Sequence, residues 1–209
     1  MHGHWLEFAQ VALAHLLAVA SPGPDFALVL RQSLRHGRRT AIWTSLGVGA
    51  GISLHIAYSL LGLGLLLRGS EMWFTAVKFA GAAYLAWVGV QALRTPPRVE
   101  TSVADAPAPP VTRGAFAAGF LTNALNPKAT LFFISLFALV VSPQTPKIVQ
   151  LAYGLWMVAA TAAWFCLVAV LFTQVAVRRR FLRHGHWIDR VLGVVFLAFA
   201  VGLVFARLR

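Results

Sequence analysis

The sequence predicts an all-α integral membrane fold with six transmembrane helices as two inverted three-helix repeats, in which helices 1 and 4 are broken. The first reason is composition: 59% of the residues are hydrophobic and 11% are charged, whereas a soluble domain carries about 25% charged residues. The second is length, because the charge-free runs 40–67 and 148–177 each exceed the roughly 20 residues that cross a bilayer. The third is that proline interrupts two of the apolar segments.

The hydropathy pattern places the six spans at about 5–30, 41–67, 72–93, 114–141, 148–176 and 188–206. No remaining segment is long enough for a soluble domain, so we expect residues 1–209 to form a single membrane domain.

The proline-rich segment 94–113 is the only long connector, and we interpret it as an extended linker. It separates a first half, 1–93, from a second half, 114–209, with three spans each. Because each half has an odd number of spans, similar halves must lie upside down relative to each other. Two landmarks recur in the same order: Pro22 corresponds to Pro127, and the block 79–87 resembles 191–199.

Positive charge predicts the orientation of the chain. Twelve Lys and Arg residues lie in or flank the segments after spans 1, 3 and 5, against four on the other side. Because positive residues stay in the cytoplasm, we expect both termini outside and the linker inside. On this interpretation the positive residues behind the net charge of +12 set the orientation of the spans and contact anionic lipid headgroups. No nucleic-acid-binding motif accompanies it, so nucleic acid is not an expected partner.

The first break reads Ser21-Pro22-Gly23-Pro24-Asp25. Proline has no N–H and crowds the preceding turn, so carbonyl groups are left open there. Asp25 has two interpretations. An acid suits the first turn of the resuming helix, but a carboxylate at membrane depth usually faces a wet cavity or a partner.

The second break reads Asn123-Ala-Leu-Asn126-Pro127-Lys128. The asparagine side chains can satisfy freed backbone groups or bind a polar solute. Lys128 has two interpretations of equal weight, an ion pair with Asp25 or a contact to a solute carboxylate. A broken membrane helix usually marks a solute site, and an acid with a base suits a zwitterion. The predicted site residues are Pro22, Gly23, Pro24, Asp25, Asn123, Asn126, Pro127 and Lys128.

Other polar residues in the spans carry weaker signals. His15 and His55 either relay protons or form interhelical hydrogen bonds. Cys166 is the only cysteine, so no disulfide or cysteine-based metal site is expected. No HExxH, P-loop or GxSxG pattern occurs, which argues against an enzyme and against a metal or other cofactor. The Ala18-Val19-Ala20 sequence mimics a signal-peptidase site, but the start lacks the basic region of a signal peptide, so we expect this segment to be retained.

With these two motifs, and with Trp187-Ile-Asp189 opening span 6, the chain resembles the LysE/RhtB amino-acid exporter family over nearly its whole length. It looks closest to the threonine-exporter branch, which shares the Pro-Gly-Pro-Asp-Phe form. The resemblance implies a multi-pass exporter of the bacterial inner (plasma) membrane, driven by proton antiport and often homo-oligomeric. Its partners would be a small amino-acid substrate, protons and the lipid bilayer.

The resemblance assigns the function to the two breaks and leaves one alternative. Asp25 is the only acid expected deep in a span, which favours a neutral amino acid such as threonine or homoserine. The alternative is a metal or ion exporter of related three-plus-three architecture, although such a protein would need several intramembrane acids or thiols.

Overall fold

The computed structural model describes residues 2–21, 23–63, 71–94, 112, 114–142 and 144–205. All regular structure in these ranges is helical, as predicted. The predicted Pro22 and most of the linker 94–113 lie outside the described residues. In chain order the elements are α1 (His2–Ala20), α2 (Pro24–Arg35), α3 (Gly37–Tyr58), the short π-helix η1 (Ser59–Leu63), α5 (Glu71–Leu93), α6 (Ala115–Ala124), α7 (Pro127–Leu139), α8 (Lys147–Leu171) and α9 (Val175–Phe205).

The helices are those of a membrane protein. By length and composition, Gly37–Leu61 and Lys147–Leu171 can each cross a bilayer, and His4–Ala20 with Pro24–Arg35 forms a third candidate span bent by 52°. Three further apolar helices are shorter, at Phe79–Leu93, Ala115–Ala124 and Pro127–Phe137.

Both predicted breaks are present, and local chemistry explains where the helices resume. Pro24 and Pro127 occupy the first positions of α2 and α7, where the missing N–H has no intrahelical acceptor to lose. Asn126 caps α7, because its Oδ1 accepts a hydrogen bond of 2.9 Å from the backbone N–H of Lys128. Each break is therefore a defined helix end followed by a defined helix start.

The last helix is longer than the predicted span. Span 6 was expected to begin near residue 188, and the helix that contains this segment, α9, begins earlier, at Val175. The basic segment before residue 188 is therefore helical as well, because arginine and leucine are good helix formers, and charge can end a membrane span without ending a helix.

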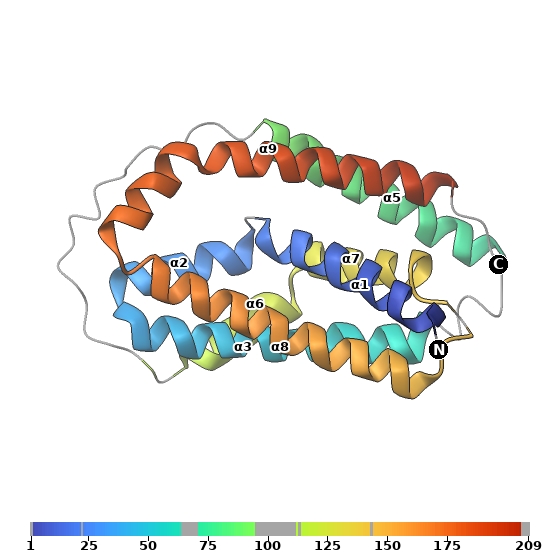
Figure 1. Cartoon of the computed structure of the whole chain (residues 1–209), viewed down its shortest axis with the longest axis horizontal. Coiled ribbons are helices and arrows are strands. Elements are labelled where there is room, and N and C mark those ends of the chain that lie inside the picture. The colour runs from blue at the N-terminus through green and yellow to red at the C-terminus, as the bar shows by residue number, and fades with distance from the viewer. Residues whose placement is uncertain are drawn as a thin grey trace.

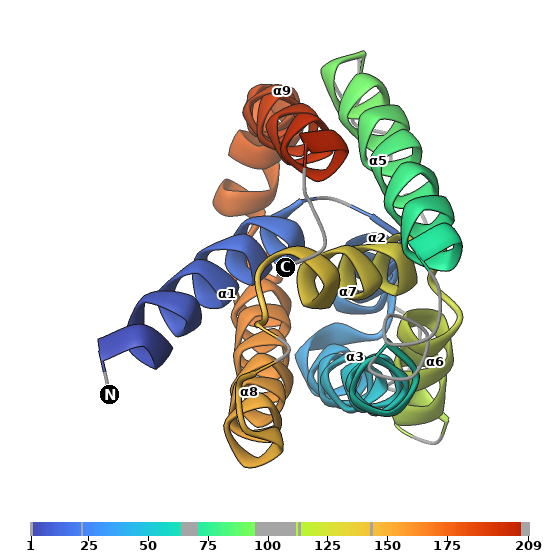
Figure 2. The ribbon, with the colours of Figure 1, turned by 90° about the vertical axis from the view of Figure 1, so that its right-hand side faces the viewer.

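The helices form three layers (Figures 1 and 2). Helices α5 and α9 lie lengthwise against each other on one side, and α3, α6 and α8 lie on the opposite side. The bent α1–α2 pair and α7 lie between these layers. The start of α1 and the end of α9 lie at the same end of the molecule. The two broken segments therefore occupy the centre of the bundle.

Glycines allow two helix pairs to approach closely. On α3 and α6, a methyl group at Gly47 would overlap the carbonyl of Phe116, and one at Gly119 would overlap the carbonyl of Thr44. On α5 and α9, a Cβ at Gly89 would lie 2.9 Å from the carbonyl oxygen of Gly193. Small residues at such crossings permit backbone contact between membrane helices.

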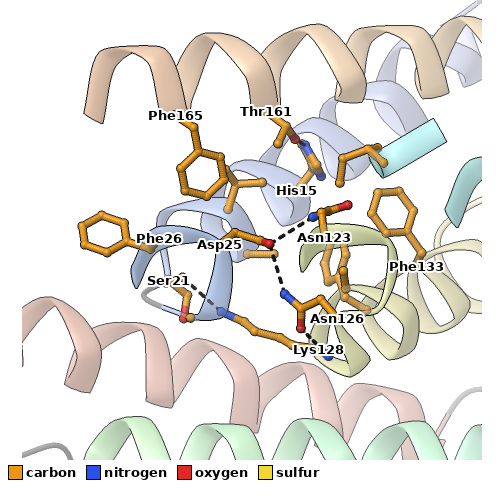
Figure 3. A pocket seen from close by; sticks show the side chains of 16 residues that line it. His15, Ser21, Asp25, Phe26, Asn123, Asn126, Lys128, Phe133, Thr161 and Phe165 are labelled. Carbon is orange, nitrogen blue, oxygen red and sulfur yellow. Dashed lines mark hydrogen bonds between the residues drawn. The ribbon is translucent and has the colours of Figure 1, made fainter. Parts of the chain in front are cut away.

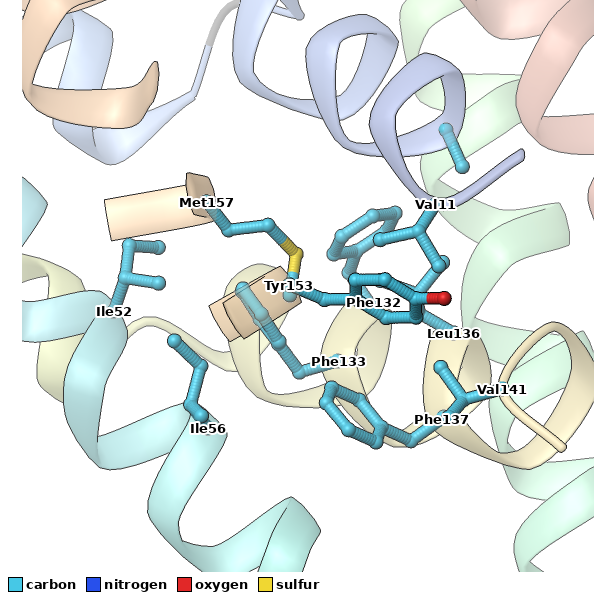
Figure 4. Packing of buried hydrophobic residues seen from close by; sticks show 11 residues of the cluster. Val11, Ile52, Ile56, Phe132, Phe133, Leu136, Phe137, Val141, Tyr153 and Met157 are labelled. Atoms are coloured by element: carbon cyan, nitrogen blue, oxygen red, sulfur yellow. The ribbon is translucent and has the colours of Figure 1, made fainter. Parts of the chain in front are cut away.

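Most of the buried hydrophobic residues fall into three clusters. The first joins α1, α3, α7 and α8 around Phe133 and Met157, which are almost fully buried (Figure 4). The second joins α2, α3 and α8 around Val29 and Phe165. The third holds α5 against α9 and includes Leu85 and Phe196. The two broken segments contribute to the first two clusters, which position the breaks.

Candidate functional site

The polar side chains of the two breaks bind each other across the bundle. The Asp25 carboxylate, in the first turn of α2, accepts two hydrogen bonds at its Oδ2 atom (Figure 3). The donors are Nδ2 of Asn123 at the end of α6 and Nδ2 of Asn126 at the start of α7, each at 3.0 Å. One acid from the first half of the chain is thus held by two amides from the second half.

Lys128 makes the reciprocal contact. Its Nζ donates a hydrogen bond of 3.0 Å to the carbonyl oxygen of Ser21, in the first break. The ammonium also lies 5.4 Å from the ring centroid of Phe196 on α9, within the range of a cation–π contact. Of the two predicted interpretations of Lys128, the direct ion pair is not the arrangement found, because Asp25 and Lys128 bind different partners here.

These side chains line a cavity of about 40 Å³, which has room for about three water molecules. Two oxygen atoms in its lining, Oδ1 of Asp25 and Oδ1 of Asn123, are buried without a hydrogen-bond partner, as is the ring nitrogen Nδ1 of His15. Because buried polar atoms are normally paired, these two oxygens offer binding capacity to a solute. The lining residues are His15, Ala18, Val19, Ser21, Gly23, Asp25, Phe26, Ile52, Asn123, Asn126, Lys128, Ala129, Phe132, Phe133, Thr161 and Phe165.

The carbonyl group of Asn123 shows how the second break is stabilised. In an unbroken helix it would accept from the N–H of residue 127, which proline lacks. Instead, Nε2 of His55 on α3 donates to it at 3.0 Å, and the backbone N–H of Asn126 donates at 2.9 Å. The His55 ring also stacks on Phe133 at 5.4 Å. His55 therefore makes the interhelical hydrogen bond that was one of its two predicted roles.

His15 also makes an interhelical contact, from α1 to α8. Its Nε2 lies 2.9 Å from Oγ1 of Thr161, and the side chain is 1% exposed. The other ring nitrogen, Nδ1, is buried without a partner. Both residues line the cavity, on the side away from Lys128 in the view of Figure 3.

The structure brings together most of the predicted site residues. Gly23, Asp25, Asn123, Asn126 and Lys128 all line the cavity. A Cβ at Gly23 would lie 3.4 Å from the Lys128 ammonium, so this glycine lies directly beside that side chain. Of the predicted prolines, Pro24 and Pro127 are exposed and start helices without lining the cavity.

Sequence reasoning missed several residues near the site. Thr161, Phe133 and Phe165 carry no local motif, and Phe26 ends the Pro-Gly-Pro-Asp-Phe motif but was not predicted as a site residue. Asp189 on α9 is 3% exposed and attracts Lys128 electrostatically, so Asp25 is not the only acid that acts there. Asp189 and Phe196 are seven residues apart, which puts both on one face of a helix. This spacing was the available sign that Asp189 faces the same neighbours as Phe196.

No metal-type cluster accompanies the site. Among the described residues, no group of three or more His, Cys, Asp or Glu side chains lies close enough together to hold a metal ion.

Comparison with known proteins identifies similar chains. The model of the LysE type translocator family matches residues 16–207. The threonine efflux protein of Escherichia coli (strain K12) is 34% identical over 202 residues, which cover 96% of this chain and 98% of that protein. The homoserine/homoserine lactone efflux protein of Salmonella typhimurium (strain LT2) is 29% identical, with 96% of each chain covered. No solved structure matches the chain.

Proposed function

Because this chain belongs to the LysE type translocator family, and is therefore a transporter and not an enzyme, we propose that it exports a small neutral amino acid from the cytoplasm. Threonine and homoserine are the first candidates, since the relatives named above are efflux proteins for these compounds. The central cavity between the two breaks is the proposed binding site.

The observation that carries this proposal is the pairing of an acid and a base in one cavity. Asp25 presents an unpaired Oδ1 atom that suits an α-ammonium group, and the Lys128 ammonium suits an α-carboxylate. Asn123 adds a second unpaired oxygen. The remaining wall is mostly apolar and aromatic, which suits a small uncharged side chain.

The fold supports a proposal for the transport cycle. We propose six spans in two inverted halves, 1–93 and 114–209, joined by a cytoplasmic linker. Three features are compatible with this arrangement: the two breaks, the contact between α3 and α8, and the contact between α5 and α9. One half would move against the other around the central site. In this scheme the chain lies in the bacterial inner membrane with both termini outside, as a homo-oligomer in the manner of its family.

Proton antiport is the proposed driving force, with Asp25 as the coupling group. The carboxylate would take a proton on the outward side and exchange it for substrate on the inward side. Its position supports this role, because the same group faces the cavity and binds both amides of the second break. Proton and substrate would therefore compete for one side chain.

Efflux from loaded vesicles tests the proposal. The purified protein is reconstituted, and the release of labelled threonine, leucine, lysine and cadmium is followed against protein-free vesicles under an imposed pH gradient. We expect threonine to leave fastest and cadmium to remain inside. Release of cadmium without release of any amino acid would overturn the proposal in favour of a metal or ion exporter.

A further inference from the structure

One polar pair in the cavity has no part in the zwitterion-binding arrangement. His15 on α1 and Thr161 on α8 are 1% exposed each, and they lie within hydrogen-bond distance of each other at 2.9 Å. Burying two polar groups in an apolar wall costs free energy unless their hydrogen bonds are complete. Here they are incomplete, because Nδ1 of His15 has no partner.

The surroundings of His15 keep the ring in place. Its centroid lies 6.2 Å from that of Phe132, 6.0 Å from that of Phe133 and 6.0 Å from that of Trp156. The backbone of Met157 on α8 also forms a hydrogen bond with the ring, so contacts from several sides hold the imidazole. The unpaired nitrogen is thus a fixed feature of a wall that also lines the cavity.

The chemistry of the imidazole limits which groups can satisfy Nδ1. If the proton is on Nε2, then Nδ1 is an acceptor. If Thr161 donates to Nε2, then Nδ1 carries the proton and is a donor. A hydroxyl group both donates and accepts, so it satisfies Nδ1 in either tautomer, whereas an alkyl group satisfies it in neither.

The geometry points to a side-chain subsite: we propose that His15, positioned by Thr161, binds the hydroxyl group of the transported amino acid. The inference rests on the proposed function and deepens it. In the view of Figure 3, Asp25 and Asn123 lie between this pair and Lys128. A hydroxy amino acid thus places its charged end between Asp25 and Lys128 and its hydroxyl group at His15. The pair selects hydroxylated substrates over alkyl substrates of the same size.

The test compares two substrates that differ only in the hydroxyl group. Reconstituted wild-type protein is assayed for KM and maximal efflux rate with threonine and with 2-aminobutyrate, which is threonine without its oxygen. We expect a preference for threonine on the order of tenfold, as for one buried hydrogen bond. The variants are His15→Phe, which retains an aromatic ring against its three neighbours, and Thr161→Val, which retains the shape of threonine.

In both variants we expect the ratio of threonine efflux to 2-aminobutyrate efflux to fall toward one, mainly because the KM for threonine rises. The matched control is Thr173→Val, since this threonine lies just beyond α8, is exposed and donates a hydrogen bond to the carbonyl of Val170. Thr161→Ser restores the hydroxyl group and should restore the preference. A purely structural pair would change folding or maximal rate for both substrates equally and leave their ratio at the wild-type value.

Two outcomes overturn the inference, and they differ from a failure of the proposed function. An unchanged ratio in Thr161→Val or His15→Phe overturns it, as does equal wild-type KM for the two substrates. If either variant fails to fold, the other variant and the wild-type ratio decide. If the wild-type protein releases neither amino acid, the proposed function itself fails.

Discussion

The ammonium group of Lys128, which belongs to the second helix break, lies 3.0 Å from the carbonyl oxygen of Ser21, which belongs to the first. Asp25, which belongs to the first break, in turn accepts hydrogen bonds from Asn123 and Asn126 of the second. Each break thus supplies the polar partner that the other one lacks. A substrate carboxylate that binds Lys128 must compete with a backbone carbonyl, and a substrate ammonium must compete with two amides.

Replacing Asp25 by asparagine should reduce export by roughly 10- to 100-fold. The amide has about the same size but carries no charge, and hydrogen bonds to a charged group are worth about 1.5–3 kcal/mol each. Efflux of labelled threonine from loaded vesicles under a pH gradient measures the effect. Full pH-driven flux in Asp25→Asn would refute the assigned role. Glu7→Gln is the matched control, because Glu7 binds Ser142 and Thr145 outside the cavity.

Exchanging the two charges should restore nothing. In the double variant Asp25→Lys with Lys128→Asp, a lysine at position 25 would face two amide donors, and an acid at position 128 would face the carbonyl of Ser21. We therefore expect the double variant to export no better than either single variant. Recovery in the same efflux assay would mean that the two groups form an ion pair during the cycle.

The sequence predicts the local parts of this site and not its cross-contacts. Proline acts on its own turn, so the helix ends at Ala20 and Ala124 and the starts at Pro24 and Pro127 follow from local chemistry. The hydrogen-bond partner of each polar group does not follow from local chemistry, because the residues that bind each other lie about a hundred positions apart in the chain.

The early start of α9 was unpredictable for a related reason. Charge density marks where a span leaves the bilayer, but it does not mark where hydrogen bonding along the helix ends. Asp189 is buried on α9, whereas the sequence alone placed this acid at the edge of a span.

Adding a methyl group at Gly51 should disturb the site through Asn123. An ideal Cβ there would lie 2.8 Å from Cβ and 2.9 Å from Oδ1 of Asn123, so the amide that binds Asp25 must move. We expect Gly51→Ala to lose export and about 1–3 kcal/mol of stability from overpacking. Gly202→Ala is the control, since in the described part of the chain no atom outside its own stretch of helix lies within 4 Å of the added group. Normal efflux and normal thermal unfolding of Gly51→Ala would contradict this prediction.

Removing the His55 donor should destabilise the end of α6. His55→Phe retains a ring against Phe133 but leaves the carbonyl of Asn123 with one donor fewer. The expected cost is about 1–3 kcal/mol for an incompletely paired buried group, measured by thermal unfolding in detergent. His55→Gln, which retains a donor, should lie between His55→Phe and wild type. Identical melting of wild type and His55→Phe would show that the bond contributes nothing.

The hydrophobic cluster of α5 and α9 affects how the protein denatures. Leu85 and Phe196 belong to a cluster whose buried members all lie on α5 and α9, and Leu17 and Ala18 of α1 pack against its edge. Groups of residues with their own cores tend to open as separate cooperative units. The α5–α9 pair should therefore exchange its amide hydrogens with its own protection level, and a single melting temperature would average two processes. A probe placed near α3 and α6 would report only the part of the molecule that carries the polar site.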